Sequence, residues 1–324
     1  MKSLVVLSSL SLVGLLSACG LRSAMSPTKG LPQVVVTNSV LCDLTQQIAQ
    51  DSVALACLIS AGTDPHLYAP TPNDRKRLET ANLILYGGYN LEPELEKLIK
   101  ASPQKITKVA ISEVAVPKPL IAEDHDHHHD HGKEPKAASK AEPDPHVWHN
   151  VQNAINMLNA INDNLAQINP SEAETYKTRT ANLTQQFTSL DSWSRPKSPP
   201  SPPQPHPRHH PRRPSATTAK PTASLSNPSK ASAPKKKPTA ARTKAVIDLV
   251  RSKKVPAIFP ETSVSPLLIQ TIARETQAKI AREPLYTDGL STIDSSGGTY
   301  QRMIVSNTRA IVDNLGGQYK RWRP

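Results

Sequence analysis

The sequence lacks a long hydrophobic segment after its first 18 residues. The run Leu4–Leu16 is apolar but too short to cross a bilayer as a mature helix, and no later run is long and apolar enough. A transmembrane helix in the mature chain is therefore excluded. The pattern His-Glu-x-x-His is also missing, and this removes a common signature of zinc hydrolases.

Acidic and aromatic residues are absent from residues 194–243. This block contains eleven Lys or Arg and 13 of the 31 prolines, and it carries +11 of the formal net charge of +12. The rest of the 324 residues is close to neutral, so nearly all of the net positive charge lies in this one segment. The remaining length suits one large or two medium globular domains.

The N-terminus is typical of an exported bacterial lipoprotein. Lys2 precedes the apolar run, which ends in the letters LSAC at Cys19, with a small residue before the cysteine. We predict a signal peptide over 1–18, acylation of Cys19 and a polar tether over 19–31. The alternative is an ordinary secretory signal with a chance cysteine. Export to a membrane-anchored position argues against nucleic acid as a partner of the basic block, although a surface-binding lipoprotein remains an alternative.

Two further cysteines, Cys42 and Cys57, would lie in the same oxidising compartment. Their even number and this location favour a disulfide between them. Two buried free thiols are the alternative, because cysteine packs well as a small hydrophobic residue.

Alternating strands and helices predict a parallel α/β lobe over 32–170. Apolar, β-branched runs predict the strands, and apolar residues at helical spacing predict the helices. The expected strands are 33–40, 53–59, 83–86 and 108–111, and the expected helices are 41–50, 73–80, 91–101 and one that begins at 151. The polar segment 122–144 interrupts this pattern and is predicted to be an exposed loop.

A second α/β segment follows a long helix. The pair Asn169-Pro170 breaks the first lobe, and Ser171 is expected to cap a helix over 171–193. After the basic block, the pattern resumes over 244–324. The expected helices there are 245–250, 265–276 and 300–315, and the expected strands are 255–259 and 279–282.

Two Asp-Pro-His tripeptides stand in comparable loops. His66 follows a predicted strand and His146 follows the polar loop, and ligands of open α/β sheets bind at the carboxyl ends of strands. Each proline stiffens the backbone beside an imidazole, and Asp64 and Asp144 could orient the rings. Either histidine alone is an ordinary surface or capping residue, but as a pair we predict that they bind a metal ion.

Carboxylates after the two C-terminal strands could complete this site. Asp288 follows the predicted strand 279–282, and Glu261 follows the strand 255–259. We predict Asp288 as a metal ligand and Glu261 as a weaker, supporting candidate. A turn-forming Asp-Gly pair is the alternative for Asp288.

The loop 122–144 contains the run HDHHHDH. Imidazole and carboxylate groups suit zinc and other borderline divalent ions. We predict that the loop captures metal weakly and without fixed geometry. The histidines of this auxiliary site are His125, His127, His128, His129 and His131.

Several stretches together resemble the substrate-binding lipoproteins of zinc/manganese ABC transporters. They are GTDPHLYAPTPND, YGGYNLEPELEKLI, DPHVW, VPAIFPETSVSP, EPLYTDGLS and YQRMIVSNTRAIVDNLGG, in this order, and they cover nearly the whole mature chain except 194–237. The resemblance implies two parallel-sheet α/β lobes joined by one long rigid helix, here 171–193, with metal between the lobes. It also implies His66, His146 and Asp288 as ligands.

The same resemblance implies a function. The protein would be the extracytoplasmic, zinc-binding component of a high-affinity metal-uptake ABC transporter. It would be a monomer that passes its ion to a permease driven by an ATPase, and not an enzyme. Zn²⁺ is favoured over the alternative, Mn²⁺, because manganese prefers more oxygen ligands. His149 stands where the family usually has an apolar residue, and we interpret it as a surface substitution.

One family feature is missing. Zinc members have a third histidine in a segment like THDAFxY at the start of the C-terminal lobe, where this chain has the basic block. Back-translation of the block with freely chosen wobble bases gives THDAFGYY and its flanking strand and helix in shifted frames. We therefore interpret 194–237 as frameshifted, in the gene or in its sequencing.

This interpretation has a physical consequence. The segment as translated has no aromatic residue, many prolines and strong positive self-repulsion, so we predict that it is disordered. The C-terminal lobe would lose its first strand and helix, and zinc binding would be weak. A non-functional frameshifted product is therefore a further alternative for the function.

Overall fold

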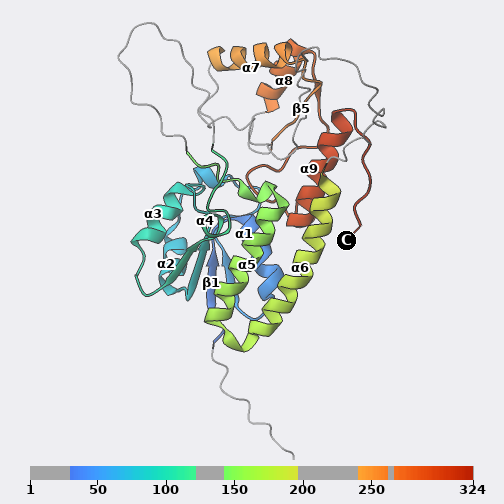
Figure 1. Cartoon of the computed structure of the whole chain (residues 1–324). Helices are drawn as coiled ribbons and strands as arrows, with labels where there is room; N and C mark the ends of the chain where they lie inside the picture. Colours follow the sequence, from blue (N-terminus) through green and yellow to red (C-terminus); the bar gives the residue numbers. More distant parts are fainter. Residues whose placement is uncertain (1–29, 122–141, 196–239, 262–265, 324) are drawn as a thin grey trace, which may run out of the picture. The chain divides into compact units, whose positions relative to one another are not determined.

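Four parallel strands form the centre of the fold. The computed structural model describes residues 30–121, 142–195, 240–261 and 266–323, and its main sheet has the order β2-β1-β3-β4 (Figure 1). The strands are β1 (Gln33–Val36), β2 (Ala54–Cys57), β3 (Leu83–Tyr86) and β4 (Thr107–Ala110). The chain divides at Leu31, and every element described here lies in the unit Pro32–Pro324.

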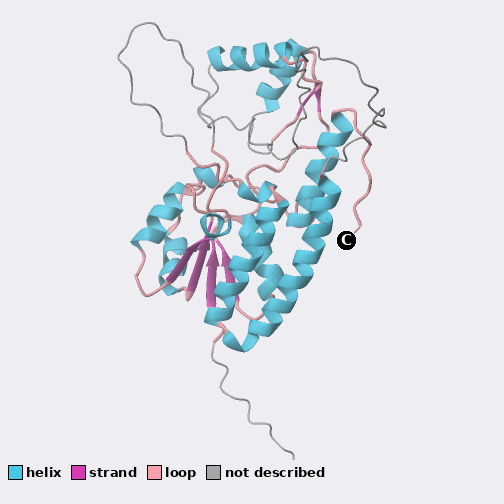
Figure 2. Ribbon diagram, viewed as in Figure 1, coloured by secondary structure: helices cyan, strands magenta, loops and turns pink. Residues whose placement is uncertain are grey.

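Helices cover both faces of this sheet (Figure 2). Successive side chains of a strand point to opposite faces, so Val34 and Val36 join one apolar core while Val35 joins the other. The first core includes α1 (Ser39–Ala49), α5 (Val151–Ile168), α6 (Ala173–Ser194) and α9 (Tyr300–Asn314), and the second includes α2 (Pro72–Thr80) and α3 (Pro93–Ala101). The predicted parallel α/β class is confirmed.

Several boundaries differ from the predictions. The first strand ends at Val36 instead of 40, because the Asn38 side chain accepts a hydrogen bond from Leu41 N (3.0 Å) and starts α1 at Ser39. The strand expected over 108–111 stops at Ala110, where the short helix α4 (Ile111–Ala115) begins at once. Tertiary contacts and caps decide such ends, which strand composition alone does not reveal.

The prediction that Ser171 caps the long helix was wrong. The hydroxyl of Ser171 donates to Asn169 Oδ1 at 2.8 Å and lies inside a 3-10 turn, η3 (Pro170–Glu172). The helix α6 then begins at Ala173 without a side-chain cap. Asn169 instead holds the turn against the first lobe, because its side-chain amide donates to Ser52 O at 3.1 Å.

The C-terminal strands are short. They are β5 (Ala257–Ile258) and β6 (Lys279–Ile280), which pair in parallel. The helix α8 (Pro266–Thr276) contacts β6, and α7 (Ala240–Ser252) contacts α8. Both strands are shorter than expected. On α7 and α8, Leu249 and Leu267 are 56% and 72% exposed. The incomplete C-terminal lobe stays a prediction, because 196–239 lies outside the described residues.

The terminal helix α9 packs on the first lobe. The ring of Tyr300 stacks on Phe187 of α6 with centroids 4.8 Å apart, and its hydroxyl donates to Trp148 O at 2.8 Å. The backbone N–H of Tyr300 donates to Asp43 Oδ2 on α1 at 2.8 Å. These contacts connect the end of the chain to the helices that cover the main sheet.

A disulfide bond joins Cys42 and Cys57 in the structure, with their Cα atoms 5.8 Å apart. A disulfide in the exported protein stays a prediction. The signal peptide, Cys19 and most of the tether lie outside the described residues. Within the described part of the chain, no helix has the length and apolar character that a membrane span requires.

A buried carboxyl group joins the loops that follow β1 and β3. Glu92 Oε1 accepts hydrogen bonds from Thr37 Oγ1 (2.6 Å), Asn38 Nδ2 (2.8 Å) and Gly87 N (3.3 Å), and the side chain is inaccessible to solvent. Burial raises the pKa of Glu92, and these three hydrogen bonds only partly oppose that shift.

The raised pKa of Glu92 predicts a pH dependence of stability. The folded state holds a proton on Glu92 more tightly than the unfolded state does, so this residue lowers stability as pH rises above the unfolded pKa, about 4.3. We expect the melting temperature of Glu92→Gln to fall less between pH 5 and pH 8 than that of the unchanged chain. The exposed Glu94→Gln is the control. Equal falls in all three proteins would contradict this prediction.

Candidate metal centre

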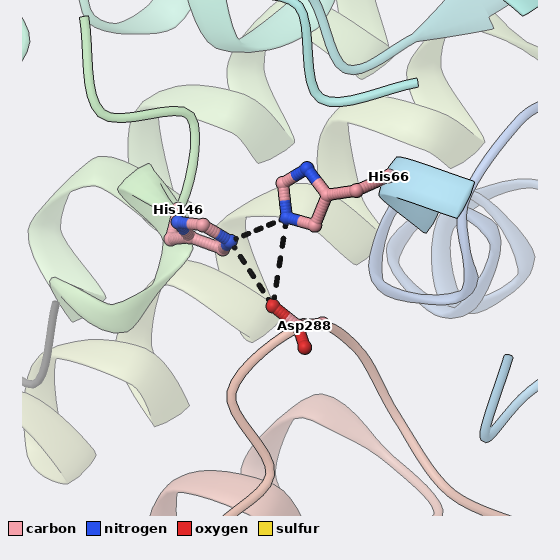
Figure 3. Close-up of side chains that lie close together, drawn as sticks. All are labelled: His66, His146 and Asp288. Carbon is pink, nitrogen blue, oxygen red and sulfur yellow. Dashed lines mark hydrogen bonds and ion pairs between the residues drawn. The ribbon is translucent and has the colours of Figure 1, made fainter. Parts of the chain in front are cut away.

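Three predicted ligands meet in the structure. His66 Nε2 lies 3.1 Å from His146 Nε2, and Asp288 Oδ1 lies 3.2 Å from His146 Nε2 and 3.6 Å from His66 Nε2 (Figure 3). One ligand atom from each residue lies within 4.8 Å of the others. The two imidazoles and the carboxylate point toward one another from loops that are far apart in the sequence.

These separations suit a small divalent ion. Tetrahedral zinc with bonds of about 2.0–2.1 Å keeps its ligand atoms about 3.3–3.4 Å apart. The three observed separations, 3.1, 3.2 and 3.6 Å, bracket that value. An ion could therefore replace the direct contacts with little movement of the side chains.

The repeated Asp-Pro-His sequence forms the same turn twice. Asp64 Oδ1 accepts from His66 N, and Asp144 Oδ1 accepts from His146 N, each at 3.0 Å. Aspartate favours such a bond to the backbone two residues on, and proline fixes the backbone between them. The first turn opens η1 (Pro65–Leu67), and the second precedes η2 (Val147–His149). The sequence motif thus determines the backbone on which each imidazole stands.

Asp144 also holds the ring of His146. Its Oδ1 lies 2.8 Å from His146 Nδ1, so Nδ1 carries a proton, and Nε2 is the nitrogen that can present a lone pair to a metal ion once it has lost its own proton. Burial lowers the pKa of His146, but hydrogen bonds to Asp144 and Asp288 and their negative charges outweigh burial and raise it to about 9. A bound cation would take the place of the Nε2 proton.

The site is only partly shielded from solvent. The side chains of His146 and Asp288 are each 10% exposed, while that of His66 is 26% exposed. The indole of Trp148 meets the His146 ring edge to face, with centroids 5.4 Å apart. An ion would thus have apolar packing on one side and a route to solvent beside His66.

The loop that carries Asp288 is held on the carboxyl edge of the main sheet. Leu290 N donates to Ser39 Oγ at 2.9 Å, and Gly62 N donates to Leu290 O at 2.8 Å. A Cβ at Gly289 would meet Ser39 Oγ at 2.7 Å, so this close approach needs glycine. On the other side of Asp288, Tyr286 N and O bond the Asn307 side chain of α9, each at 2.9 Å.

His149 was wrongly interpreted as a surface substitution. Its side chain is partly buried, and Nε2 lies 2.8 Å from the backbone O of Thr287. Burial and the positive charge of His146 lower the pKa of His149 to about 4. Because a carbonyl only accepts, Nε2 is the donor in this bond.

Glu261 lies near the site but outside the ligand group. Its Oε2 is 3.5 Å from Thr287 Oγ1, and its backbone forms a parallel bridge with Leu285. It therefore contacts the segment that leads to Asp288. The five histidines between 125 and 131 fall outside the described residues, so the auxiliary site stays a prediction.

Ser39, Asn307 and His149 are the contacts that sequence reasoning missed. Each acts on a loop far away in the chain, and none stands in a metal-binding motif. The departure of His149 from an otherwise apolar family position was the one available signal.

A parallel α/β sheet with two imidazoles and a carboxylate at its carboxyl edge defines a candidate metal-binding protein. The family model "Zinc-uptake complex component A periplasmic" matches residues 34–314, and the chain belongs to this family.

Curated relatives match over nearly their whole length. The "Manganese ABC transporter substrate-binding lipoprotein scaA" of Streptococcus gordonii is 27% identical over 321 residues, covering 96% of this chain and 97% of the relative. The "Zinc-binding protein TroA" of Treponema pallidum is 29% identical over 317 residues, covering 94% of each. These relatives are named for different metals.

Solved structures share the fold. The periplasmic zinc-binding protein TroA of Treponema pallidum aligns with a TM-score of 0.67 and 23% identity, over 88% of this chain and 99% of that one. A Mn-bound periplasmic metal-binding protein from Candidatus Liberibacter asiaticus aligns with a TM-score of 0.64 and 22% identity, over 87% and 99%.

Removal of each ligand should weaken zinc binding. We expect His66→Ala, His146→Ala and Asp288→Ala to lower zinc affinity about 100-fold or more, and Asp144→Ala about 10–100-fold, because it acts through His146. The measurement is competition against a chromophoric chelator with metal-stripped protein. The parent protein and every variant carry alanine in place of the five histidines of 125–131, so that these histidines do not compete with the site for zinc.

The exposed Asp51→Ala is the control and should bind as the parent does. Parent-like affinity in either histidine variant would contradict the assignment of these ligands.

Proposed function

We propose that this protein is the extracytoplasmic component of an ABC importer and that it captures Zn²⁺ as cargo. The observation that supports this most is the convergence of His66, His146 and Asp288, with ligand atoms 3.1–3.6 Å apart. Two nitrogens and one oxygen form a donor set that suits zinc.

The arrangement fits an ion that must enter and leave. His66 and His146 stand on turns of the first lobe, and Asp288 stands on a separate loop that hydrogen bonds hold in place. Withdrawal of the Asp288 loop would remove one ligand and open the site. Such a step would favour release to a permease, because an ion that loses one of its three protein ligands is held more weakly.

We propose that the site is not catalytic. Zinc hydrolysis needs a general base beside the metal-bound water, and the aspartates of the two turns already have other roles. Asp144 orients His146, and Asp64 bonds the backbone of His66. The names of the relatives also describe binding proteins, one of them the substrate-binding lipoprotein of a transporter.

The remaining parts of the proposal concern location and partners. A lipid on Cys19 would keep the protein at the outer face of a membrane, where a permease and its ATPase receive the ion. We propose a monomer, because the three described ligands come from one chain.

Selectivity between zinc and manganese tests the choice of cargo. We expect zinc to bind at least about 100-fold more tightly than manganese, since imidazole nitrogen suits zinc and manganese prefers oxygen. Competition experiments would give both affinities. Any nitrogen site favours zinc to some extent, so His66→Asp is the comparison and should reduce the ratio. Equal or tighter manganese binding would instead support manganese as the cargo.

A non-functional frameshifted product is the alternative. The third histidine that the family resemblance implies would fall in 194–237, mostly outside the described residues. Resequencing across codons 190–245 distinguishes the two cases. If it restores THDAFGYY in frame, the protein would gain a ligand in addition to the three described here. If the present reading is confirmed, the chain should bind zinc through three protein ligands only, and more weakly.

A further inference from the structure

His149 lies outside the group of metal ligands, but it contacts the loop that carries one of them. Its Nε2 donates to the carbonyl O of Thr287 at 2.8 Å, and Thr287 directly precedes Asp288. The two residues come from parts of the chain 138 positions apart. The bond therefore connects the peptide beside Asp288 to the first lobe.

The other hydrogen bonds to the backbone of this loop lie farther from the ligand, and Glu261 reaches Thr287 only at its side chain, with 3.5 Å between Oε2 and Oγ1. Asn307 bonds Tyr286, which is two residues before Asp288, and Ser39 and Gly62 bond Leu290, two residues after it. The contact from His149 reaches the residue next to Asp288. It is thus placed to determine the direction of the carboxylate.

The donor is itself held by the turn that presents His146. The turn η2 (Val147–His149) begins directly after His146, and His149 N donates to His146 O at 3.4 Å. The imidazole of His149 packs beside the Trp148 indole, with centroids 5.6 Å apart, and Trp148 O accepts from Tyr300 Oη at 2.8 Å. One short turn therefore positions a ligand at its start and a hydrogen-bond donor at its end.

We infer that His149 is a positioning residue for metal capture, which sets the distance between Asp288 Oδ1 and His146 Nε2 by bonding Thr287 O. The inference rests on the proposed function, since it needs Asp288 to bind the ion. The contact keeps Asp288 3.2 Å from His146 Nε2. Its atoms all lie outside 194–237.

An apolar residue at position 149 could not replace this contact. It has no donor for Thr287 O, and a partly buried carbonyl without its partner is destabilising. The peptide before Asp288 would then move to find another donor. A glutamine carries an amide N–H at a similar distance from the backbone, whereas asparagine is one bond shorter.

A double-mutant cycle with zinc as the probe tests this role. The variants His149→Leu, His149→Asn and His149→Gln are made in the whole chain, each with and without Asp288→Ala, and zinc affinity is measured by chelator competition. We expect the leucine and asparagine variants to bind about 10–100-fold more weakly, as for other partners that orient a ligand. Glutamine should restore affinity to within about 5-fold of the parent.

In the Asp288→Ala background, the leucine variant should change zinc affinity by less than about 2-fold, because no carboxylate remains to be positioned. An equal loss in both backgrounds would overturn the inference, since His149 would then act on the fold. Parent-like binding by both the leucine and asparagine variants would also overturn it. Melting curves identify any variant that fails to fold, and the asparagine and glutamine pair then decides the question.

The cycle also separates this inference from the proposed function. If Asp288→Ala weakens binding but the His149 variants do not, only the role of His149 is wrong. If Asp288→Ala leaves zinc affinity unchanged, Asp288 is no ligand, and both the site and the inference fail.

Discussion

The loop from Leu285 to Leu290 rests on the carboxyl edge of the main sheet, and the candidate site depends on this contact. Ser39 and Leu290 are 251 residues apart, yet their hydrogen bond closes one end of the loop on the first lobe. His149 bonds the loop at Thr287 O, directly before Asp288. With these bonds in place, Asp288 Oδ1 lies 3.2 Å from His146 Nε2 and 3.6 Å from His66 Nε2.

The two halves of the site arise in different ways. His66 and His146 are positioned locally, because each Asp-Pro-His sequence folds into the same turn with the same 3.0 Å bond. Asp288 is positioned by partners from distant elements. Local chemistry is visible in a sequence, which is why the repeated tripeptide predicted the two histidines. The contact of His149 with Thr287 was missed because its partner is a backbone carbonyl, which every residue possesses.

The same distinction explains how well the fold was predicted. Alternating β-branched and helical segments located β1 to β4 and the helices between them, since one buried face dictates each pattern. The ends of elements were less predictable. A single cap at Asn38 shortened the first strand, and a 3-10 turn displaced the start of α6. In the C-terminal part, β5 and β6 have two residues each and are shorter than the predicted strands.

The central claim is that two imidazoles and one carboxylate of this chain bind the same ion. X-ray absorption at the zinc edge tests it most directly, with one equivalent of zinc on the whole chain whose histidines of 125–131 are alanine. The account predicts two imidazole ligands with oxygen completing the shell, and one imidazole after His146→Ala. A sulfur ligand, or an unchanged imidazole count in that variant, would contradict it.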